Sequence, residues 1–188
     1  MRRVIWKKFW AWDFDKEEAW LNKMAGIGLQ LTGVSFPFRF EFEDGTPGEY
    51  AVRLELLDHW PSHPESAQYI RFVEDTGAEH IGSIMRWVYF RKKTDAGGFD
   101  LFSDIDSRIR HLNRILTLIG CLGPLQAVNT VNLSLRLFAG RSYLTSGDVL
   151  TFTAVLLPLT ALLAMLVYGF IRLALKKRKL KKARALYE

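Results

Sequence analysis

VLTFTAVLLPLTALLAMLVYGFI, residues 149–171, is the stretch that decides the fold, because none of its 23 positions carries a charged side chain. As a helix rising about 1.5 Å per residue it would measure about 34 Å, against a hydrocarbon core of about 30 Å in a bilayer. A buried helix of a soluble core is the alternative, but such helices are usually much shorter. The sequence therefore predicts a membrane-spanning helix.

A basic segment follows this span. It begins at Arg172 and is rich in Lys and Arg up to Arg184. Segments of this kind stay on the cytoplasmic side of a membrane, where they lie against anionic lipid headgroups. We therefore predict contact with anionic lipid of the bilayer for Lys176, Lys177, Arg178, Lys179, Lys181, Lys182 and Arg184.

A second apolar stretch, residues 115–135, also lacks charged side chains and predicts another span. Gln126, Asn129 and Thr130 share one face of it. Polar side chains inside a membrane either line a path for a solute or pack against a neighbouring span. Packing is the simpler interpretation, because a solute path built from one hairpin per chain would require an oligomer.

The beginning of the chain does not have the pattern of a signal peptide, since the segment 2–8, which contains four basic residues, is followed by no apolar run of seven or more residues. The N-terminal region should therefore stay in the cytoplasm, together with the basic tail. Two termini on one side require an even number of spans. We predict an inner- or plasma-membrane protein with two spans, both termini cytoplasmic and residues 136–147 outside.

The charge is distributed unevenly along the chain. The formal net charge is +6, but residues 172–188 contain eight Lys/Arg and one Glu, so the other residues sum to −1. A nucleic-acid-binding domain would need clustered basic residues among exposed aromatics, so we expect no nucleic acid as a partner. The single cysteine, Cys121, can form no internal disulfide, which is typical of a reducing compartment.

The first hundred residues alternate between strand and helix patterns. Asp15 to Glu18 form a helix start signal, and Pro64 suits the first turn of a second helix that ends at Gly77. The predicted strands are residues 4–12, 29–34, 36–43, 50–57, 79–84 and 86–92, and the first helix is residues 15–25.

This order, β-α-β-β-β-α-β-β, predicts an α+β fold. We expect an antiparallel sheet with two helices on one face, a ferredoxin-like variant, followed by a two-helix transmembrane hairpin. The predicted domains are a cytoplasmic α+β domain over 1–98, a juxtamembrane helix or linker over 99–111, the hairpin over 112–175 and the basic cytoplasmic tail over 176–188.

Strands 36–43 and 50–57 are separated by a turn sequence and predict a hairpin. Pairing Phe42 with Val52 would place Glu41 opposite Arg53 and Arg39 opposite Glu55, two favourable cross-strand charge pairs. We therefore expect this register.

His59 and His63 are the best metal candidates, as an H-x₃-H pair in a loop. Zinc takes three or four ligands, and neither a cysteine nor a clustered carboxylate completes the pair nearby, so we expect no metal site and no cofactor. The sequence contains no nucleophile elbow, phosphate-binding loop, dinucleotide fingerprint or metalloprotease motif. We expect no catalytic residue and a non-enzymatic protein.

All six tryptophans precede residue 99. A small domain rarely encloses so many large rings, because each indole N–H needs a partner and the rings are seldom fully buried. We therefore predict that some of these side chains lie at a surface and bind a partner: Trp6, Trp10, Trp12 and Trp60.

Three stretches together resemble a bacterial family catalogued as domain of unknown function 2812. They are KFWAWDFDKEEAWLNKMAGIGLQL (8–31), FVEDTGAE (72–79) with WVYFRK (87–92), and LFSDIDS (101–107). The resemblance covers about residues 5–112, with Ala78 standing where the family usually has tryptophan. It implies this fold with a membrane hairpin after it, and it implies no catalytic residue. Members tend to be encoded near PadR-like transcription regulators, which favours a regulatory role.

The predicted function is that of a membrane-tethered cytoplasmic binding or regulatory module, an adaptor or sensor, for a protein partner or a second copy of the chain. The alternative is an accessory or oligomeric subunit of a transport assembly. A free sheet edge or face bearing aromatics would favour the adaptor, and a continuous polar strip along the spans would favour transport. A pocket that combines His59, His63 or His80 with carboxylates would favour an enzyme.

Overall fold

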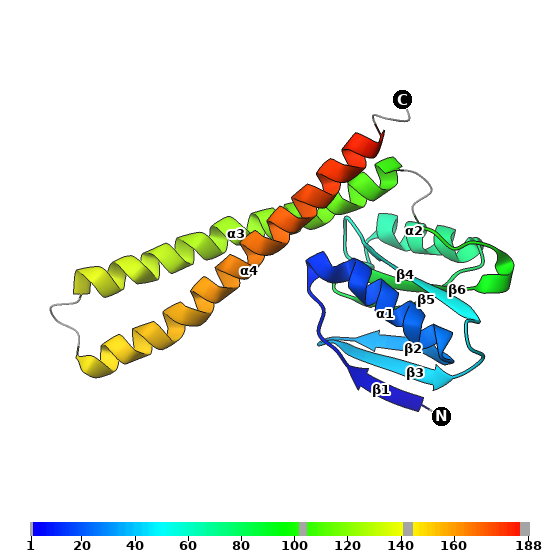
Figure 1. The fold of residues 1–188 in the computed structure, drawn as a ribbon, viewed down its shortest axis with the longest axis horizontal. Coiled ribbons are helices and arrows are strands. Elements are labelled where there is room, and N and C mark those ends of the chain that lie inside the picture. The colour runs from blue at the N-terminus through cyan, green and yellow to red at the C-terminus, as the bar shows by residue number, and fades with distance from the viewer. Residues whose placement is uncertain (1, 102–104, 141–144, 185–188) are drawn as a thin grey trace. The chain divides into compact units, whose positions relative to one another are not determined.

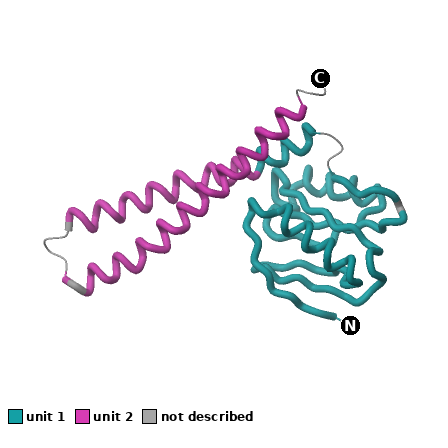
Figure 2. The backbone as a smooth tube through the Cα atoms, in the orientation of Figure 1, with its two compact units in different colours: residues 1–114 teal, residues 115–188 magenta. Residues whose placement is uncertain are grey.

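The computed structural model describes residues 2–101, 105–140 and 145–184. The chain divides into two compact units, residues 1–114 and residues 115–188 (Figure 2). The first unit holds all the strands, and the second holds most of two long helices. The α+β fold class with a following helical hairpin is confirmed.

The first unit is built from two successive copies of one β-α-β-β arrangement (Figure 1). The first copy consists of β1 (Arg2–Trp6), α1 (Phe14–Gly26), β2 (Leu29–Ser35) and β3 (Arg39–Asp44). The second consists of β4 (Tyr50–Leu56), α2 (Pro64–Asp75), β5 (Glu79–Ile84) and β6 (Trp87–Lys93). Two short 3₁₀ turns lie at Ala11–Asp13 and Thr94–Ala96. This is the predicted order of elements.

Each copy forms its own three-stranded antiparallel sheet, and the strand order is equivalent in the two sheets: β1-β3-β2 and β4-β6-β5. The second strand of each copy is irregular at the equivalent place. The register shifts between Leu31 and Gly33 in β2 and between His80 and Gly82 in β5. The shared order and the shared bulge identify the first unit as an internal repeat, which the sequence patterns did not indicate.

The predicted hairpin between β3 and β4 does not form. Phe42 lies opposite Arg3 and Leu31, and Val52 lies opposite Arg91. The reason is that β3 is the central strand of its sheet, so both of its edges are already paired within the first copy. The turn after Asp44 therefore connects two sheets rather than two paired strands.

Helix α1 lies between the two sheets. Trp20 packs edge-to-face on Phe40 and Phe42 of β3, with ring centroids 5.2 and 5.7 Å apart. On the side of the second sheet, Glu17 accepts a hydrogen bond from Tyr89 of β6. The helix is therefore a shared core element of both copies.

Helix α2 covers the opposite face of the second sheet. Neighbouring residues of a strand point to opposite faces, so Val88 and Phe90 point away from Tyr89 and α1. These two side chains form a buried cluster with Ile70 and Val73 of α2. The structure thus differs from the predicted single sheet with both helices on one face, because two sheets offer α1 and α2 separate faces (Figure 1).

The outer edge of β4 is covered by side chains of α1. Asn22 exchanges two hydrogen bonds of 2.9 Å with the backbone N–H and C=O of Val52, as a neighbouring strand would. Glu18 accepts a bond of 3.4 Å from the N–H of Leu54. The strands β2 and β5 contact one another across the two sheets. Among the described strands, β1 therefore keeps an edge beside which no other strand lies.

Two long helices complete the chain: α3 (Ile105–Gly140) and α4 (Ser146–Arg184). Both are long and apolar enough to cross a membrane, over Ile105–Ala139 and Gly147–Arg184. The predicted juxtamembrane helix and first span are thus parts of one continuous helix. Within the second unit the Gln126 amide donates a 3.3 Å hydrogen bond to the Leu159 carbonyl, which fits packing between the spans.

Candidate functional site

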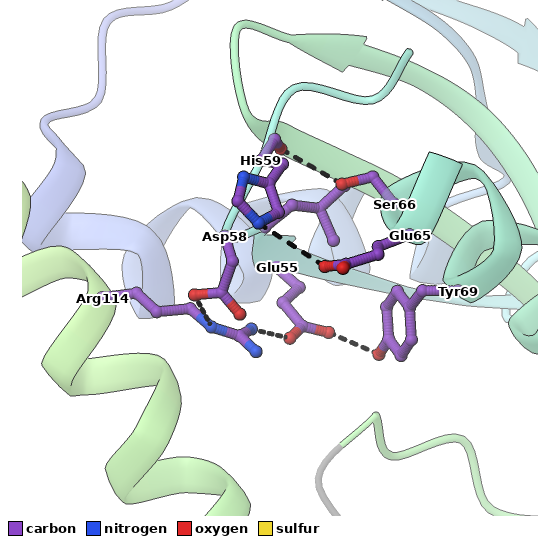
Figure 3. A pocket seen from close by; sticks show the side chains of 8 residues that line it. Glu55, Asp58, His59, Glu65, Ser66, Tyr69 and Arg114 are labelled. Atoms are coloured by element: carbon purple, nitrogen blue, oxygen red, sulfur yellow. Dashed lines mark hydrogen bonds and ion pairs between the residues drawn. The ribbon is translucent and has the colours of Figure 1, made fainter. Parts of the chain in front are cut away.

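A buried carboxylate at the end of β4 forms the centre of a polar cluster (Figure 3). Glu55 is 4% exposed, accepts a 2.6 Å hydrogen bond from the Tyr69 hydroxyl of α2, and pairs at 2.5 Å with the Arg114 guanidinium of α3. The same guanidinium reaches Asp58 at 2.8 Å. Three elements that are distant in sequence meet here through charge-assisted bonds.

Burial decides the electrostatics of this cluster. Removal from water raises the pKa of Glu55, although the Tyr69 hydroxyl and the Arg114 guanidinium both favour its ionised form. Burial also raises the pKa of Tyr69, and the neighbouring carboxylate adds to that rise. The phenol therefore stays protonated and serves as a donor to Glu55.

A cavity of about 200 Å³ opens beside this cluster. Its lining combines the four members of the cluster with side chains from the β4–α2 loop and the first turn of α2: Glu55, Leu57, Asp58, His59, Glu65, Ser66, Tyr69 and Arg114. A pocket lined by a histidine and several carboxylates is the feature that would favour chemistry over simple binding. Figure 3 shows His59 and Glu65 approaching one another at this cavity.

The H-x₃-H loop folds so that its two imidazoles meet. The rings of His59 and His63 stack with centroids 4.2 Å apart and planes 25° from parallel. His59 Nε2 lies 3.5 Å from Glu65 Oε2. The sequence analysis found no carboxylate to complete this pair, whereas the structure brings Glu65 beside it, because the first turn of α2 directs this side chain back toward the loop.

A second cavity, of about 580 Å³, is lined mainly by residues of the same loop. It is lined by Asp58, His59, Trp60, Ser62, His63, Pro64 and Arg86. The Nε atom of Arg86 is buried there and has no hydrogen-bond partner among the described residues. The two cavities share Asp58 and His59 in their linings.

A second buried carboxylate lies between the sheets, apart from these cavities. Glu17 of α1 accepts a 2.6 Å hydrogen bond from the Tyr89 hydroxyl of β6. Burial raises the pKa of Glu17 to about 7, and the hydrogen bond from Tyr89 only partly opposes this rise. This group therefore changes its charge near neutral pH inside the core.

The four tryptophans predicted to bind a partner have different environments. Trp6 on β1 and Trp60 in the β4–α2 loop are exposed, by 63% and 56%. Trp10 is half-buried and stacks on Trp12 with ring centroids 5.4 Å apart. Trp12 is only 4% exposed, so its predicted role as a surface contact is wrong. Its ring is core, because the 3₁₀ turn at Ala11–Asp13 directs it inward.

The surface at the β1 edge is defined by Val4, Trp6, Lys7 and Lys8. Val4 and Trp6 are both exposed large apolar side chains. Lys7 Nζ lies 4.6 Å from the Trp20 ring centroid, and Lys8 Nζ lies 4.0 Å from that of Trp10. Neither lysine forms an ion pair with any residue that the structure describes, so this surface combines an open backbone edge with unpaired positive charge.

The predicted lipid-binding residues lie in the last turns of α4. Lys176 and Lys177 are partly buried, and Arg178, Lys179, Lys181, Lys182 and Arg184 are exposed. The helix is continuous from the apolar segment to Arg184, so the basic segment extends the second candidate span without a break. Contact of these residues with anionic lipid stays a prediction.

The polar cluster around Glu55 was missed by the sequence analysis. Glu55 alternates with Leu54 and Leu56, a pattern that normally assigns the charged residue to a solvent-facing side. Its partner Arg114 comes 59 residues later, in a segment read as the approach to a membrane span. One feature of the sequence could have indicated the cluster: Tyr69 lies on the predicted inward-facing side of α2, where its hydroxyl needs a buried hydrogen-bond partner.

Comparison with known proteins gives one family. The sequence model of a family described as "Protein of unknown function (DUF2812)" matches residues 13–123, more than half of the chain. The matched segment begins before α1 and ends inside α3, so it includes the β4–α2 loop and the whole Glu55 cluster. No curated protein and no solved structure is detectably similar to the chain.

Proposed function

We propose, from the premise that this chain belongs to the DUF2812 family of proteins of unknown function, that it is a membrane-tethered adaptor. It captures a protein partner by pairing an extended, acidic segment of that partner with the open edge of β1. The observation that carries the proposal is this edge, which presents exposed Trp6 beside two lysines that pair with no acidic side chain in the described part of the chain.

The backbone of β1 supports the mode of binding. An edge strand presents unpaired N–H and C=O groups, and an extended peptide can add to it as a further strand. Such edges also invite aggregation, and proteins commonly cover them. Here α1 covers the edge of β4 through Asn22 and Glu18, while β1 has no described strand on its outer side. The difference favours a docking role for β1.

The side chains support the chemistry of the partner. Exposed tryptophan is enriched among residues that dominate binding energies, and Trp6 is the most exposed of the tryptophans that we predicted to bind a partner. Lys7 and Lys8 favour Asp or Glu in the bound segment, since opposite charges across an interface speed encounter and fix register. Arg2 and Arg3 are already paired with Glu43 and Asp44.

The long helices support the tether. Two spans would place residues 1–114 and the end of α4 on the same side, and the basic segment favours the cytoplasmic side of a cell membrane. The segment from Lys176 to Arg184 would then lie against anionic lipid. The adaptor would present its β1 edge to cytoplasmic or membrane partners.

The affinity experiment uses the full chain, extracted in mild detergent, with co-purifying proteins identified and quantified. Trp6→Ala should reduce the captured partner at least about tenfold, because truncating an aromatic hot spot costs roughly 2 kcal/mol or more. Exchanging Lys7 and Lys8 for Glu should reduce capture as well. The matched control is Phe72→Ala, an aromatic that is 64% exposed on α2 and far from β1 in sequence.

Two results would contradict the adaptor at β1. One is that Trp6→Ala and Phe72→Ala reduce capture equally. The other is that the captured protein contains no extended acidic segment whose synthetic peptide competes for binding. Thermal unfolding of each variant, measured in parallel, separates a loss of binding from a loss of folded protein.

Membrane topology gives an independent expected result. A Ser142→Cys variant in a Cys121→Ala background should react with a membrane-impermeant thiol reagent in intact cells; residues 141–144 lie outside the described part of the structure. Gln68→Cys on α2, in the same background, is the control and should react only after membrane disruption. The reverse labelling pattern would contradict the two-span topology with cytoplasmic termini.

A further inference from the structure

We propose that His59, His63 and Glu65 bind a divalent first-row transition-metal ion, with zinc as the reference ion. The potential donor atoms of these three side chains all lie within 4.8 Å of one another. No other such group of three potential ligands occurs among the described residues. The site is separate from the β1 edge, so it neither depends on the proposed adaptor function nor supports it.

The donor types suit this class of ion. Two imidazoles and one carboxylate form one of the ligand sets that proteins use for zinc, with Zn–N and Zn–O distances of about 2.0–2.2 Å. Imidazole nitrogen favours zinc and its neighbours in the first transition row over magnesium or calcium, which prefer all-oxygen sites. The carboxylate supplies negative charge, since the imidazoles bind as neutral ligands.

The local backbone holds the three ligands in place. The N–H of His63 donates a 2.9 Å hydrogen bond to the Trp60 carbonyl, closing a tight turn that contains Pro61. This turn brings the imidazole of His63 back onto that of His59. Pro64 then begins α2, and proline fixes the backbone φ angle at both places.

Further hydrogen bonds join this turn to the helix. The Ser66 hydroxyl donates to the His59 carbonyl at 3.3 Å, and the N–H of Ala67 donates to the His63 carbonyl at 2.9 Å. Glu65 lies in the first turn of α2, directly between these anchored residues. The ligands are therefore carried by a backbone that is already ordered, which reduces the entropy lost when an ion binds.

An unsatisfied atom supplies a second observation. The Nδ1 atom of His63 is buried and has no hydrogen-bond partner among the described residues. A buried polar atom without a partner costs free energy, and native structures rarely leave one without a reason. An ion, or a water molecule held by that ion, provides the missing partner for the His63 ring.

Closing the site requires only side-chain rotation. In a tetrahedral site the donor atoms stand about 3.4 Å apart, given the bond lengths above. His59 Nε2 and Glu65 Oε2 are already 3.5 Å apart; the Glu65 side chain is largely exposed and that of His59 is about half exposed. Asp58 is held by Arg114 and does not join the set. Three protein ligands leave a fourth position for water or for a donor atom of another molecule.

The experiment measures binding of zinc to the full-length chain in detergent, purified with a tag that contains no histidine. All variants carry Cys121→Ala, which removes the one thiol of the chain. Competition with a chromogenic chelator should give one ion per chain. His59→Ala and His63→Ala should each weaken binding roughly 10- to 100-fold or more, and Glu65→Gln about tenfold.

The matched control is His80→Ala, since His80 forms a hydrogen bond with Ser83 and is not part of the His59, His63 and Glu65 group. Cobalt(II) provides a second readout, because tetrahedral coordination produces intense visible absorption bands that the three ligand variants should lose. Trp6→Ala should bind zinc like the parent chain. Unchanged zinc affinity after His59→Ala and His63→Ala, or equal loss in His80→Ala, would overturn the proposal. Circular dichroism of each variant shows whether its fold is intact.

Discussion

Replacing Arg114 by alanine should lower the free energy of unfolding of the first unit by about 3–5 kcal/mol, the usual effect of removing one partner from a buried ion pair. The variant would leave the Glu55 carboxylate buried with the Tyr69 hydroxyl as its one remaining partner among the described residues. Asp58 would also lose its cation. Denaturant unfolding followed by tryptophan fluorescence measures the change, and all six tryptophans lie in residues 1–114.

The control for Arg114 is Arg108→Ala on the same helix. Arg108 pairs with Asp100 at 2.5 Å, but both side chains are about half exposed, so its removal should change stability by less than about 1 kcal/mol. Replacing Glu55 by leucine together with Arg114 by methionine should restore much of the lost stability, since no charge is then left buried. Equal effects of the two arginine substitutions would contradict this account of the cluster.

Replacing Glu17 by glutamine should stabilise the protein at pH 8 by as much as about 3 kcal/mol. In the folded protein the pKa of Glu17 is about 7, against 4.5 as its ordinary value. Between these two values the folded chain holds a proton that the unfolded chain has released. The stability that this group contributes is therefore complete below about pH 4.5, declines as pH rises, and is lost above about pH 7.

The expected gain in stability of about 3 kcal/mol follows from the difference between the two pKa values, since each pKa unit corresponds to about 1.36 kcal/mol. Glutamine has no charge at any pH, and its amide oxygen can still accept the hydrogen bond from Tyr89. We expect the parent and the Glu17→Gln variant to have similar stability at pH 4.5 and to diverge up to pH 7. Unfolding curves at five pH values test this result.

Burial also raises the pKa of Glu55, but this residue is present in both the parent and the Glu17→Gln variant. The difference in stability between the two proteins therefore reports on Glu17 alone. Glu74→Gln, at an exposed position on α2, serves as the control and should leave the pH dependence unchanged. A parallel shift of the Glu17→Gln stability at all pH values would mean that packing, rather than ionisation, explains the effect.

The sequence predicted the elements of the first unit better than their pairing. Turn residues and apolar spacing identify where each strand and helix begins, because these signals are local. Pairing depends on partners far along the chain, and alternation alone made β3 and β4 look like a hairpin. The charge pairs expected for Arg39 and Arg53 exist with other partners, Glu41 on the same strand and Glu18 on α1.

The candidate site shows the same limit. His59 and His63 could be identified as a possible ligand pair from their spacing, whereas Glu65 was overlooked because it follows a proline that starts a helix. Trp6 and Trp60 lie at the surface as predicted. Trp12 is buried. The number of tryptophans in the sequence indicates that some rings must lie at the surface, but it does not identify which ones.

The internal repeat has a consequence for how the chain folds during synthesis. Every strand pairs within its own copy, so both sheets can form from contacts of moderate sequence separation, a feature associated with faster folding. The first copy leaves the ribosome with α1 covered on one side only. Glu17 then meets water until β6 emerges with Tyr89. We therefore expect α1 to be fully covered only after the second sheet has formed.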